Sequence, residues 1–263
     1  MKSLVAAKLF CDDCLDGLSR MPEGSVDMVL ADPPYGITKC RWDTPLDLGR
    51  MWKALRRVCK PNAAMLFFAQ CPFDKVLGTS NLKALRYEWV WDKGRNTGFM
   101  NVGKMPMKRT ENVLVFYDRL PKFNPQYTKG EPYRRMPSPT AWSDVYGRPV
   151  YKRYRENDSF RQPLNLITFP YNVKALVHPT QKPADLCEYL IRSYTDPGDT
   201  VLDICAGSGT TAVAAVNSGR DWLAFEKEPE YCRIAEGRIL DAMREKRRSL
   251  FFRKFQDGAR EAS

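Results

Sequence analysis

Long apolar runs are missing from this sequence, and so are internal repeats. No stretch approaches the roughly twenty apolar residues that span a bilayer, and residues 1–8 hold no apolar core long enough for a secretory signal. We therefore expect no membrane partner and a cytoplasmic location. The composition, 43% hydrophobic and 28% charged, is that of a globular chain.

Histidine is almost absent, since His178 is the only one. Cys11 and Cys14 form a C-x-x-C pair, but no second pair follows to complete a zinc site, and His178 lies far along the chain. We predict no metal site. The eight cysteines are scattered, and we expect them to be reduced, mostly buried thiols.

Acidic residues are too few to balance the basic ones. The chain has 42 Lys or Arg against 31 Asp or Glu, a net charge of +11 and a pI near 9.3. Residues 92–162 alone hold fifteen basic and seven acidic residues, a surplus of eight. A surplus of this size, gathered in about a quarter of the chain, favours a polyanionic partner.

Short apolar or β-branched runs between turn residues predict strands buried on both faces. We expect strands at residues 26–31, 64–69, 87–91, 112–117, 200–204 and 222–225, helices at 48–59, 210–218 and 229–247, and a helix opened by residues 181–183. Strands alternating with helices predict a mostly parallel, doubly wound α/β sheet. In such sheets ligands bind beyond the carboxyl ends of the strands. Two unusual turns, after Ala31 and after Ile204, lie at such ends, so one shared site is predicted.

The second of these turns is Cys205-Ala206-Gly207-Ser208-Gly209-Thr210-Thr211, directly before a helix. Glycines let backbone approach a ligand closely, and a helix N-terminus offers N–H groups. Glu226, at the end of the next strand, is placed for ribose hydroxyls. The third glycine of the dinucleotide fingerprint is missing, which disfavours a nicotinamide oxidoreductase. By itself, a structural turn explains this segment about as well.

The first turn is the rarer combination Asp32-Pro33-Pro34-Tyr35. Neither proline has an N–H, so the carbonyls nearby remain available as acceptors at a fixed angle. An amino group on a base needs acceptors that orient it toward an electrophile, and Asp32 and the Pro33 carbonyl would supply two. Tyr35 could stack on a base removed from its helix. A capped Pro-rich turn would explain the prolines but not the whole combination.

Three segments together resemble a known family. Asp32-Pro33-Pro34-Tyr35, then His178-Pro179-Thr180-Gln181-Lys182-Pro183, then Asp203 with Gly207-Ser208-Gly209-Thr210-Thr211 occur in the order of the β-class amino DNA methyltransferases, the N-4/N-6 DNA methylases. The resemblance covers about residues 8–117 and 165–240. It implies a Rossmann-like methyltransferase sheet with the catalytic half before the cofactor half, S-adenosylmethionine as cofactor and double-stranded DNA as partner. It also implies direct methyl transfer from sulfonium to nitrogen, with no covalent enzyme intermediate.

Position by position, the resemblance assigns catalysis to Asp32, Pro33, Pro34 and Tyr35. The residues that it implies for cofactor binding are Asp13, Cys14, Asp32, His178, Thr180, Gln181, Lys182, Pro183, Asp203, Cys205, Ala206, Gly207, Ser208, Gly209, Thr210, Thr211, Glu226 and Lys227. The family more often has an aromatic residue just before Gly-x-Gly, whereas Cys205-Ala206 stands here. That position therefore offers no ring for stacking.

The target base is predicted from the residue that leads the Pro-Pro pair. In several relatives Asp goes with adenine N6 and Ser with cytosine N4, so Asp32 favours adenine. Cytosine N4, RNA or protein amide methylation, and a catalytically silent DNA-binding relative remain alternatives. A homodimer and a cognate restriction enzyme stay open as partners, and no endonuclease motif is apparent.

Basic and aromatic residues interleave between the two halves. Cations neutralise phosphates, while aromatic rings and Arg stack on or read bases. We predict DNA contacts from loops at 93–99 and 104–109 and from the insert, through Lys93, Arg95, Lys108, Arg109, Arg134, Arg135, Arg148, Lys152, Arg153 and Arg155. A solvated basic surface is the alternative.

The predicted organisation has four parts: a catalytic half at 1–118, a target-recognition insert at 119–172, a cofactor half at 173–243 and a basic C-terminal tail at 244–263. The tail either contacts phosphates or solvates the end of a helix, and the second is favoured.

Overall fold

A computed structural model describes residues 7–38, 40, 43–135, 155–157, 159–171 and 181–261. These residues form two compact units. The main unit comprises Met1–Asn124 and Asn165–Ser263, and the insert unit comprises Pro125–Leu164.

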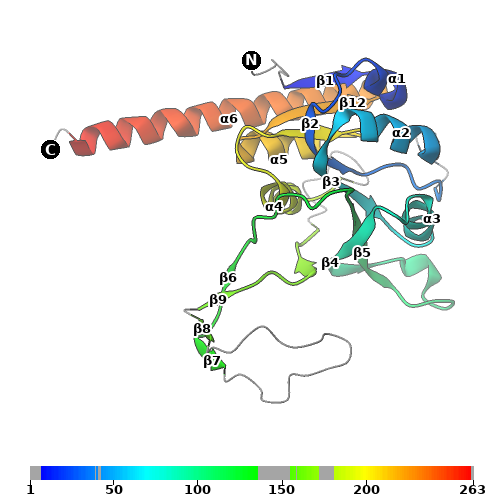
Figure 1. Cartoon of the computed structure of the whole chain (residues 1–263), viewed down its shortest axis with the longest axis horizontal. Coiled ribbons are helices and arrows are strands. Elements are labelled where there is room, and N and C mark those ends of the chain that lie inside the picture. The colour runs from blue at the N-terminus through cyan, green and yellow to red at the C-terminus, as the bar shows by residue number, and fades with distance from the viewer. Residues whose placement is uncertain are drawn as a thin grey trace. The chain divides into compact units, whose positions relative to one another are not determined.

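The main unit is built on one large sheet (Figure 1). Within the described residues it has eight strands, in the order β1 (Lys8–Cys11), β12 (Asp221–Glu226), β11 (Thr200–Asp203), β2 (Val26–Ala31), β3 (Cys59–Ala69), β5 (Lys108–Phe116), β4 (Leu85–Thr97) and β10 (Leu166–Thr168). Strand β5 is antiparallel to both of its neighbours, and the other pairs are parallel. The predicted mostly parallel, Rossmann-like sheet is confirmed.

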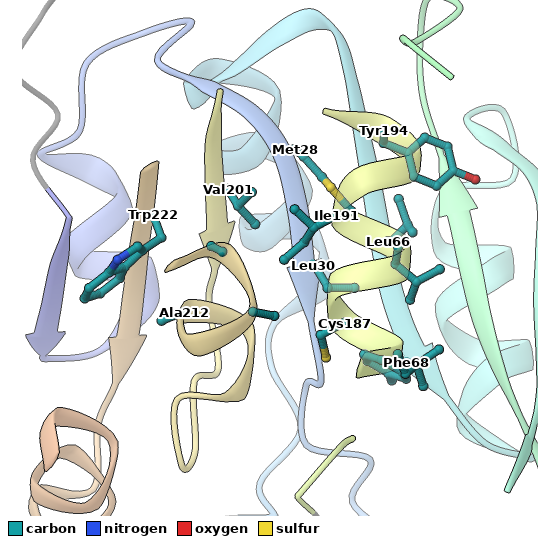
Figure 2. Close-up of a cluster of buried hydrophobic side chains, with 14 of the residues drawn as sticks. Met28, Leu30, Leu66, Phe68, Cys187, Ile191, Tyr194, Val201, Ala212 and Trp222 are labelled. Atoms are coloured by element: carbon teal, nitrogen blue, oxygen red, sulfur yellow. The ribbon is translucent and has the colours of Figure 1, made fainter. Parts of the chain in front are cut away.

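Helices cover both faces of the sheet because the central strands are apolar on both faces. Helices α1 (Cys14–Ser19), α2 (Leu48–Val58) and α3 (Phe73–Ser80) pack on one face, and α4 (Ala184–Tyr194), α5 (Thr210–Ser218) and α6 (Pro229–Glu261) pack on the other. Side chains alternate along a strand, so Met28 and Leu30 of β2 face α4 and α5, as Figure 2 shows. Val29 and Ala31 belong to the opposite core. Each face therefore has its own buried cluster.

Four neighbouring parallel strands end at the same edge of the sheet. Asp12 and Asp13 follow β1, Asp32 follows β2, Asp203 ends β11 and Glu226 ends β12. Parallel strands bring their carboxyl ends together, so five acidic residues spread over the sequence meet at one edge.

Helix starts around this edge follow from local capping. The Asp13 carboxylate accepts the Leu15 N–H at 2.8 Å and begins α1. Helix α5 begins after Gly209, whose φ of 78° is left-handed, and it ends at Gly219 with the same φ. Because left-handed backbone favours glycine, these two residues bound the helix predicted at 210–218.

The two predicted loops at 93–99 and 104–109 are partly strand, at 93–97 and at 108–109. Strand β4 continues to Thr97 and β5 begins at Lys108, because the two strands pair as a long hairpin as far as the Thr97–Lys108 position. Only residues 98–107 connect them, including a short 3₁₀ turn at Phe99–Asn101. The predicted tail also differs, since α6 runs from Pro229 to Glu261. The basic segment from residue 244 is thus helix at least to Glu261.

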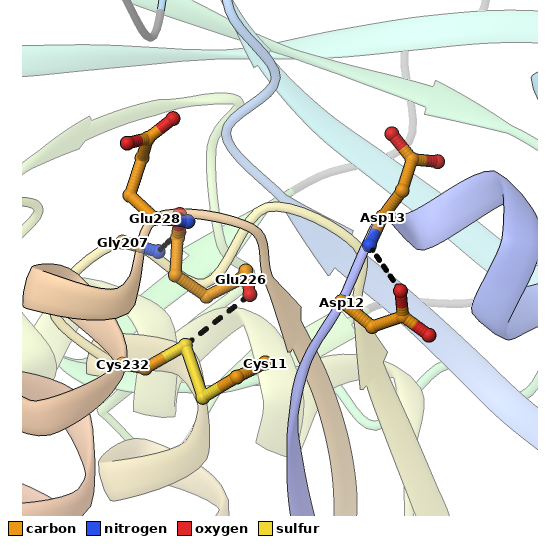
Figure 3. Close-up of a disulfide and its surroundings, with 7 residues drawn as sticks. All are labelled: Cys11, Asp12, Asp13, Gly207, Glu226, Glu228 and Cys232. Carbon is orange, nitrogen blue, oxygen red and sulfur yellow. Dashed lines mark hydrogen bonds between the residues drawn. A yellow bond between two sulfur atoms is a disulfide. The ribbon is translucent and has the colours of Figure 1, made fainter.

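The expectation of reduced thiols is wrong for two cysteines. Cys11 at the end of β1 and Cys232 in α6 form a disulfide, with their Cα atoms 5.9 Å apart (Figure 3). The pair is 221 residues apart in sequence, so no local pattern indicates it. Among the other cysteines, Cys14, Cys59 and Cys187 are buried free thiols.

The insert unit is a ribbon of short antiparallel pairs. Strand β6 (Thr128–Lys129) pairs with β9 (Phe160–Arg161), and β7 (Tyr133–Arg135) pairs with β8 (Arg155–Asn157). This unit is narrower than the predicted insert at 119–172, because β10 joins the main sheet beside β4. In neither unit does a described helix combine the length and apolar character needed to cross a membrane.

Candidate active site

A cavity of about 450 Å³ lies in the main unit, at the edge where the parallel strands end. Both unusual turns line it: Asp32, Pro33, Pro34 and Tyr35 on one side and the glycine turn on the other. The two turns therefore share one site, as their places at strand ends predict. Its volume is in the range of small-molecule sites.

The Asp32 carboxylate is held by two neighbours. Its Oδ2 lies 2.6 Å from Lys182 Nζ, and its Oδ1 accepts a hydrogen bond of 2.7 Å from the Tyr35 hydroxyl. Pro33 is buried beside it, and the side chain of Asp32 keeps 24% of its surface exposed. The carboxylate thus lines the cavity, and its contacts with Lys182 and Tyr35 fix its position.

Glu111 completes this cluster, and sequence reasoning missed it. Its Oε1 lies 3.1 Å from Lys182 Nζ and 2.9 Å from the Tyr35 hydroxyl, while its Oε2 lies 2.7 Å from Lys93 Nζ. An acidic residue directly before the apolar run 112–117 is a detectable oddity of the sequence. Its partners, however, come from other strands and loops.

Burial and charge act against each other in this cluster. Burial raises the pKa of Asp32, Lys182 opposes that rise and Glu111 adds to it, and the net direction is upward. Burial would also raise the pKa of Glu111, but the ammonium groups of Lys182 and Lys93 bring it down to about 2. Burial would lower the pKa of Lys182, yet Asp32 and Glu111 raise it. Glu111 and Lys182 are therefore both charged at neutral pH.

The Tyr35 ring already packs against another aromatic ring of the protein. Its ring stacks on Phe73 with centroids 5.0 Å apart, and Lys182 Nζ lies 5.9 Å from its centroid. The loop after it is held by Asp43, whose carboxylate accepts backbone N–H bonds of 2.7–2.9 Å from residues 36–38. Stacking of Tyr35 on a base stays a prediction.

The glycine turn is pinned by side chains from α6 and β12. The Gly207 N–H donates to Glu226 Oε2 at 2.7 Å, and Glu226 Oε1 accepts the Glu228 N–H at 2.9 Å (Figure 3). Arg238 donates to the Ser208 carbonyl and, at 3.1 Å, to the Thr210 hydroxyl. Gly209 packs so closely on α6 that an added Cβ would lie 3.0 Å from Ala235 Cβ.

Asp203 sits at the floor of the cavity beneath this turn. It is buried and accepts the Cys205 N–H at 2.9 Å. Burial raises its pKa to about 7, an effect that the Cys205 and Thr211 hydrogen bonds reduce and that Asp32 and Glu226 reinforce. The charge of this carboxylate therefore changes near neutral pH.

The end of β1 closes the cavity. Asp12, Asp13 and Cys14 line it, and the Cys14 thiol contacts that of Cys205, which lowers the pKa of Cys14. Together with Asp203 and Glu226, these side chains give this end an acidic lining that suits a cationic ligand bearing hydroxyl groups. Among the described residues, no three His, Cys, Asp or Glu side chains are grouped to hold a metal ion.

The cavity gathers most of the predicted site residues. Pro183 and Gly209 are absent from its lining, and His178 and Thr180 lie outside the described residues. Predicted residues on its wall are Asp13, Cys14, Asp32, Pro33, Pro34, Tyr35, Gln181, Lys182, Asp203, Cys205, Ala206, Gly207, Ser208, Thr210, Thr211, Glu226 and Lys227. Lining residues that were not predicted include Phe68, Trp91, Glu111, Tyr171 and Tyr231.

Four of the predicted DNA-contacting residues lie on the β4–β5 hairpin, and each contacts another side chain. Lys93 pairs with Glu111 and is only 11% exposed, which does not favour contact with a phosphate. Arg109 binds Asp92 through two bonds of 2.8 and 3.0 Å. Arg95 lies 5.8 Å from the Tyr171 ring centroid, and Lys108 Nζ lies 3.3 Å from Gln70 Oε1.

The remaining predicted DNA contacts come from the insert. Arg134 and Arg135 lie in β7, and Arg155 lies in β8. Arg148, Lys152 and Arg153 lie outside the described residues. All of these stay predictions.

A DNA methylase family model for N6 and N4 enzymes matches residues 26–237, which include the Asp-Pro-Pro-Tyr turn, the glycine turn and most of the sheet. The chain belongs to this N6/N4 DNA methylase family. It is accordingly an S-adenosylmethionine-dependent DNA methyltransferase.

Two curated relatives of this methyltransferase cover most of it. It is 29% identical to type II methyltransferase M.BglII of Bacillus subtilis, over 87% of this chain and 67% of that protein. It is 28% identical to type II methyltransferase M1.MboII of Moraxella bovis, over 83% of this chain and 91% of that protein.

Solved structures share its fold. The M1.HpyAVI–S-adenosylmethionine complex is 23% identical, with a TM-score of 0.59 over 88% of this chain and 98% of that one. The cytosine-N4-specific PvuII DNA methyltransferase is 19% identical, with a TM-score of 0.65 over 92% of both chains.

Cofactor affinity should depend on pH through Asp203. An ionised Asp203 would attract the positively charged S-adenosylmethionine if the cofactor binds beside it as predicted, and burial raises the pKa of Asp203 to about 7. We expect affinity to rise by up to about tenfold per pH unit from 5.5 to 7, and to level off above. Calorimetric titration at several pH values measures this. Asp203→Asn should bind more weakly and with a flat profile, and a flat profile in the unchanged protein would contradict the role given to Asp203.

Proposed function

We propose that this methyltransferase transfers the methyl group to the exocyclic N6 of adenine in double-stranded DNA, after the base has flipped out of the helix. The observation that carries the proposal is Asp32, a carboxylate that leads the Pro-Pro pair at the cavity wall and is held by Lys182 and Tyr35. The Asp32 carboxylate and the Pro33 carbonyl would accept the two N–H bonds of the amino group. The lone pair of the amino nitrogen would then point at the methyl group of the donor.

The cofactor would occupy the end of the cavity built by β1, β11 and β12. Glu226 would bind the ribose hydroxyls, and Asp203 with the glycine turn would hold the methionine part. Residues Asp13 and Cys14 would flank the adenine. S-adenosylmethionine supplies an electrophilic methyl group, and the acidic lining with backbone N–H groups at the start of α5 supports this placement.

Product analysis tests the choice of base. The protein is incubated with duplex DNA and methyl-labelled S-adenosylmethionine, and the DNA is digested to nucleosides and analysed by mass spectrometry. We expect label in N6-methyladenine only. Label in N4-methylcytosine would overturn the proposal, and no label at all would favour a silent DNA-binding relative. Sequencing of the modified DNA then gives the recognition sequence.

The insert is proposed to hold the target DNA through its arginines. Changing Arg134, Arg135, Arg153 and Arg155 to Glu should weaken duplex binding more than about tenfold at 0.1 M salt. The slope of log K against log salt should fall by about three to four, because each lost phosphate contact removes about 0.9. Fluorescence anisotropy over a salt series measures both. Arg244, Arg247 and Arg248 changed to Glu in α6 serve as the matched control, and an equal loss there would contradict the proposal.

A further inference from the structure

We infer that Glu111 is a positioning residue for methyl transfer: it balances the charge of the two lysines and accepts a hydrogen bond from Tyr35, so that the charge and a lone pair of Asp32 stay available to the target amino group. The inference rests on the role proposed for Asp32, but not on which base is methylated. Glu111 lines the cavity, but its side chain is only 6% exposed and it is not proposed to touch the substrate.

Placement of Glu111 follows from the β4–β5 pairing. Glu111 on β5 stands opposite Trp91 on β4, and Lys93 follows two residues later on the same face of β4. Lys93 lies 5.3 Å from the Trp91 ring centroid and 2.7 Å from Glu111 Oε2. The Glu111 side chain is only 6% exposed. Both of its oxygens are thus engaged in a place that water barely reaches.

The cluster is electrically balanced. Asp32 and Glu111 carry two negative charges, and Lys93 and Lys182 carry two positive ones, with carboxylates and ammonium groups alternating at 2.6–3.1 Å. Without the charge of Glu111, the single negative charge of Asp32 would face the two positive charges of Lys93 and Lys182. The site would then carry one excess positive charge beside a nitrogen that becomes positive during transfer.

Tyr35 gives Glu111 a second effect on Asp32. The Tyr35 hydroxyl has one proton, and it lies 2.7 Å from Asp32 Oδ1 and 2.9 Å from Glu111 Oε1. It can donate to only one of these oxygens at a time. When Glu111 takes that proton in its hydrogen bond, Asp32 Oδ1 is left free to accept from the amino group.

A purely structural salt bridge is the competing explanation for Glu111. In that case its loss would lower the melting temperature and reduce every activity in proportion. The charge-balance role instead predicts a selective effect on positively charged states. S-adenosylmethionine has a cationic sulfur, and its demethylated product, S-adenosylhomocysteine, has a neutral one. The ratio of their dissociation constants therefore reports the local charge, apart from catalysis.

Glu111→Gln is the main test, because it removes the charge and keeps the size. We expect kcat to fall about 10²-fold with KM for DNA changed less than about threefold. The dissociation constant of S-adenosylmethionine should rise about tenfold relative to that of S-adenosylhomocysteine. Glu88→Gln, an exposed residue of β4, is the matched control and should change neither quantity.

Two further variants fix the sign of the effect. Lys93→Met leaves an excess negative charge, so the binding ratio should shift in the opposite direction. The double variant Glu111→Gln with Lys182→Met restores neutrality and should return the ratio to within about threefold of the unchanged protein. An unchanged ratio in Glu111→Gln, or in Lys93→Met if the Gln variant does not fold, overturns the inference. So does a double variant whose ratio stays shifted as far as that of Glu111→Gln alone. An active Asp32→Asn variant would instead defeat the proposed role of Asp32 itself.

Discussion

Replacing Asp32 with Asn is expected to lower kcat on the order of 10³-fold, the largest catalytic loss we expect from a single side chain. Asn keeps the size of Asp but offers a neutral acceptor and an N–H₂ group that faces the target amine. The acceptor charge that stabilises the developing positive nitrogen is then gone. Lys182 keeps Glu111 as a partner at 3.1 Å, so we expect the variant to fold. Single-turnover methyl transfer to duplex DNA measures the loss.

The control for this variant lies three residues after Lys182. Asp185 is exposed in the first turn of α4, and Asp185→Asn should change kcat less than about twofold. Calorimetry should show that Asp32→Asn still binds S-adenosylmethionine. Near-normal turnover in a folded Asp32→Asn protein would remove Asp32 from the catalytic step and with it the main support for the proposed function.

A large loss of stability is expected for Gly209→Ala. Gly209 has a φ of 78°, which costs about 1 kcal/mol for a residue with a Cβ. The new methyl group would also lie 3.0 Å from Ala235 Cβ and 3.2 Å from Ala235 Cα in α6. Such overpacking against backbone costs about 1–3 kcal/mol more. Thermal unfolding should show a melting temperature lower by roughly 5–15 °C.

Variants at two other glycines distinguish the cost of backbone strain from the cost of steric overlap. Gly207 has a φ of 51° and nothing within 4 Å of an added Cβ, so Gly207→Ala should cost only about 1 kcal/mol of strain. Because Gly207 lines the cavity, its new methyl group should weaken cofactor binding more than stability. Gly237→Ala in α6 meets nothing within 4 Å and should not destabilise the protein. Equal melting temperatures for the Gly209 and Gly207 variants would contradict the close-packing explanation.

Much of this protein is determined within short windows of its sequence. The bounds of α5 are predictable because Gly209 and Gly219 mark both ends, and β2 because its apolar run stops at Asp32. Each of the two turns follows an apolar run and therefore lies at the end of a strand. These strands, β2 and β11, are neighbours in the sheet. Periodicity, capping and turn chemistry are local properties, so sequence alone carries the fold class and the two turns.

What only the tertiary structure decided is which distant residues meet. Lys182 reaches Asp32 across 150 residues, Tyr35 reaches Glu111 across 76, and Cys11 reaches Cys232 across 221. Each contact depends on strand order and register, which no local pattern encodes. Lys93 illustrates the difference: its charge suggested a phosphate contact, but the β4–β5 register turns it toward Glu111 inside the cavity. The Asp-Pro-Pro-Tyr turn was therefore determined by the sequence, and the charges that surround it by the packing of the sheet.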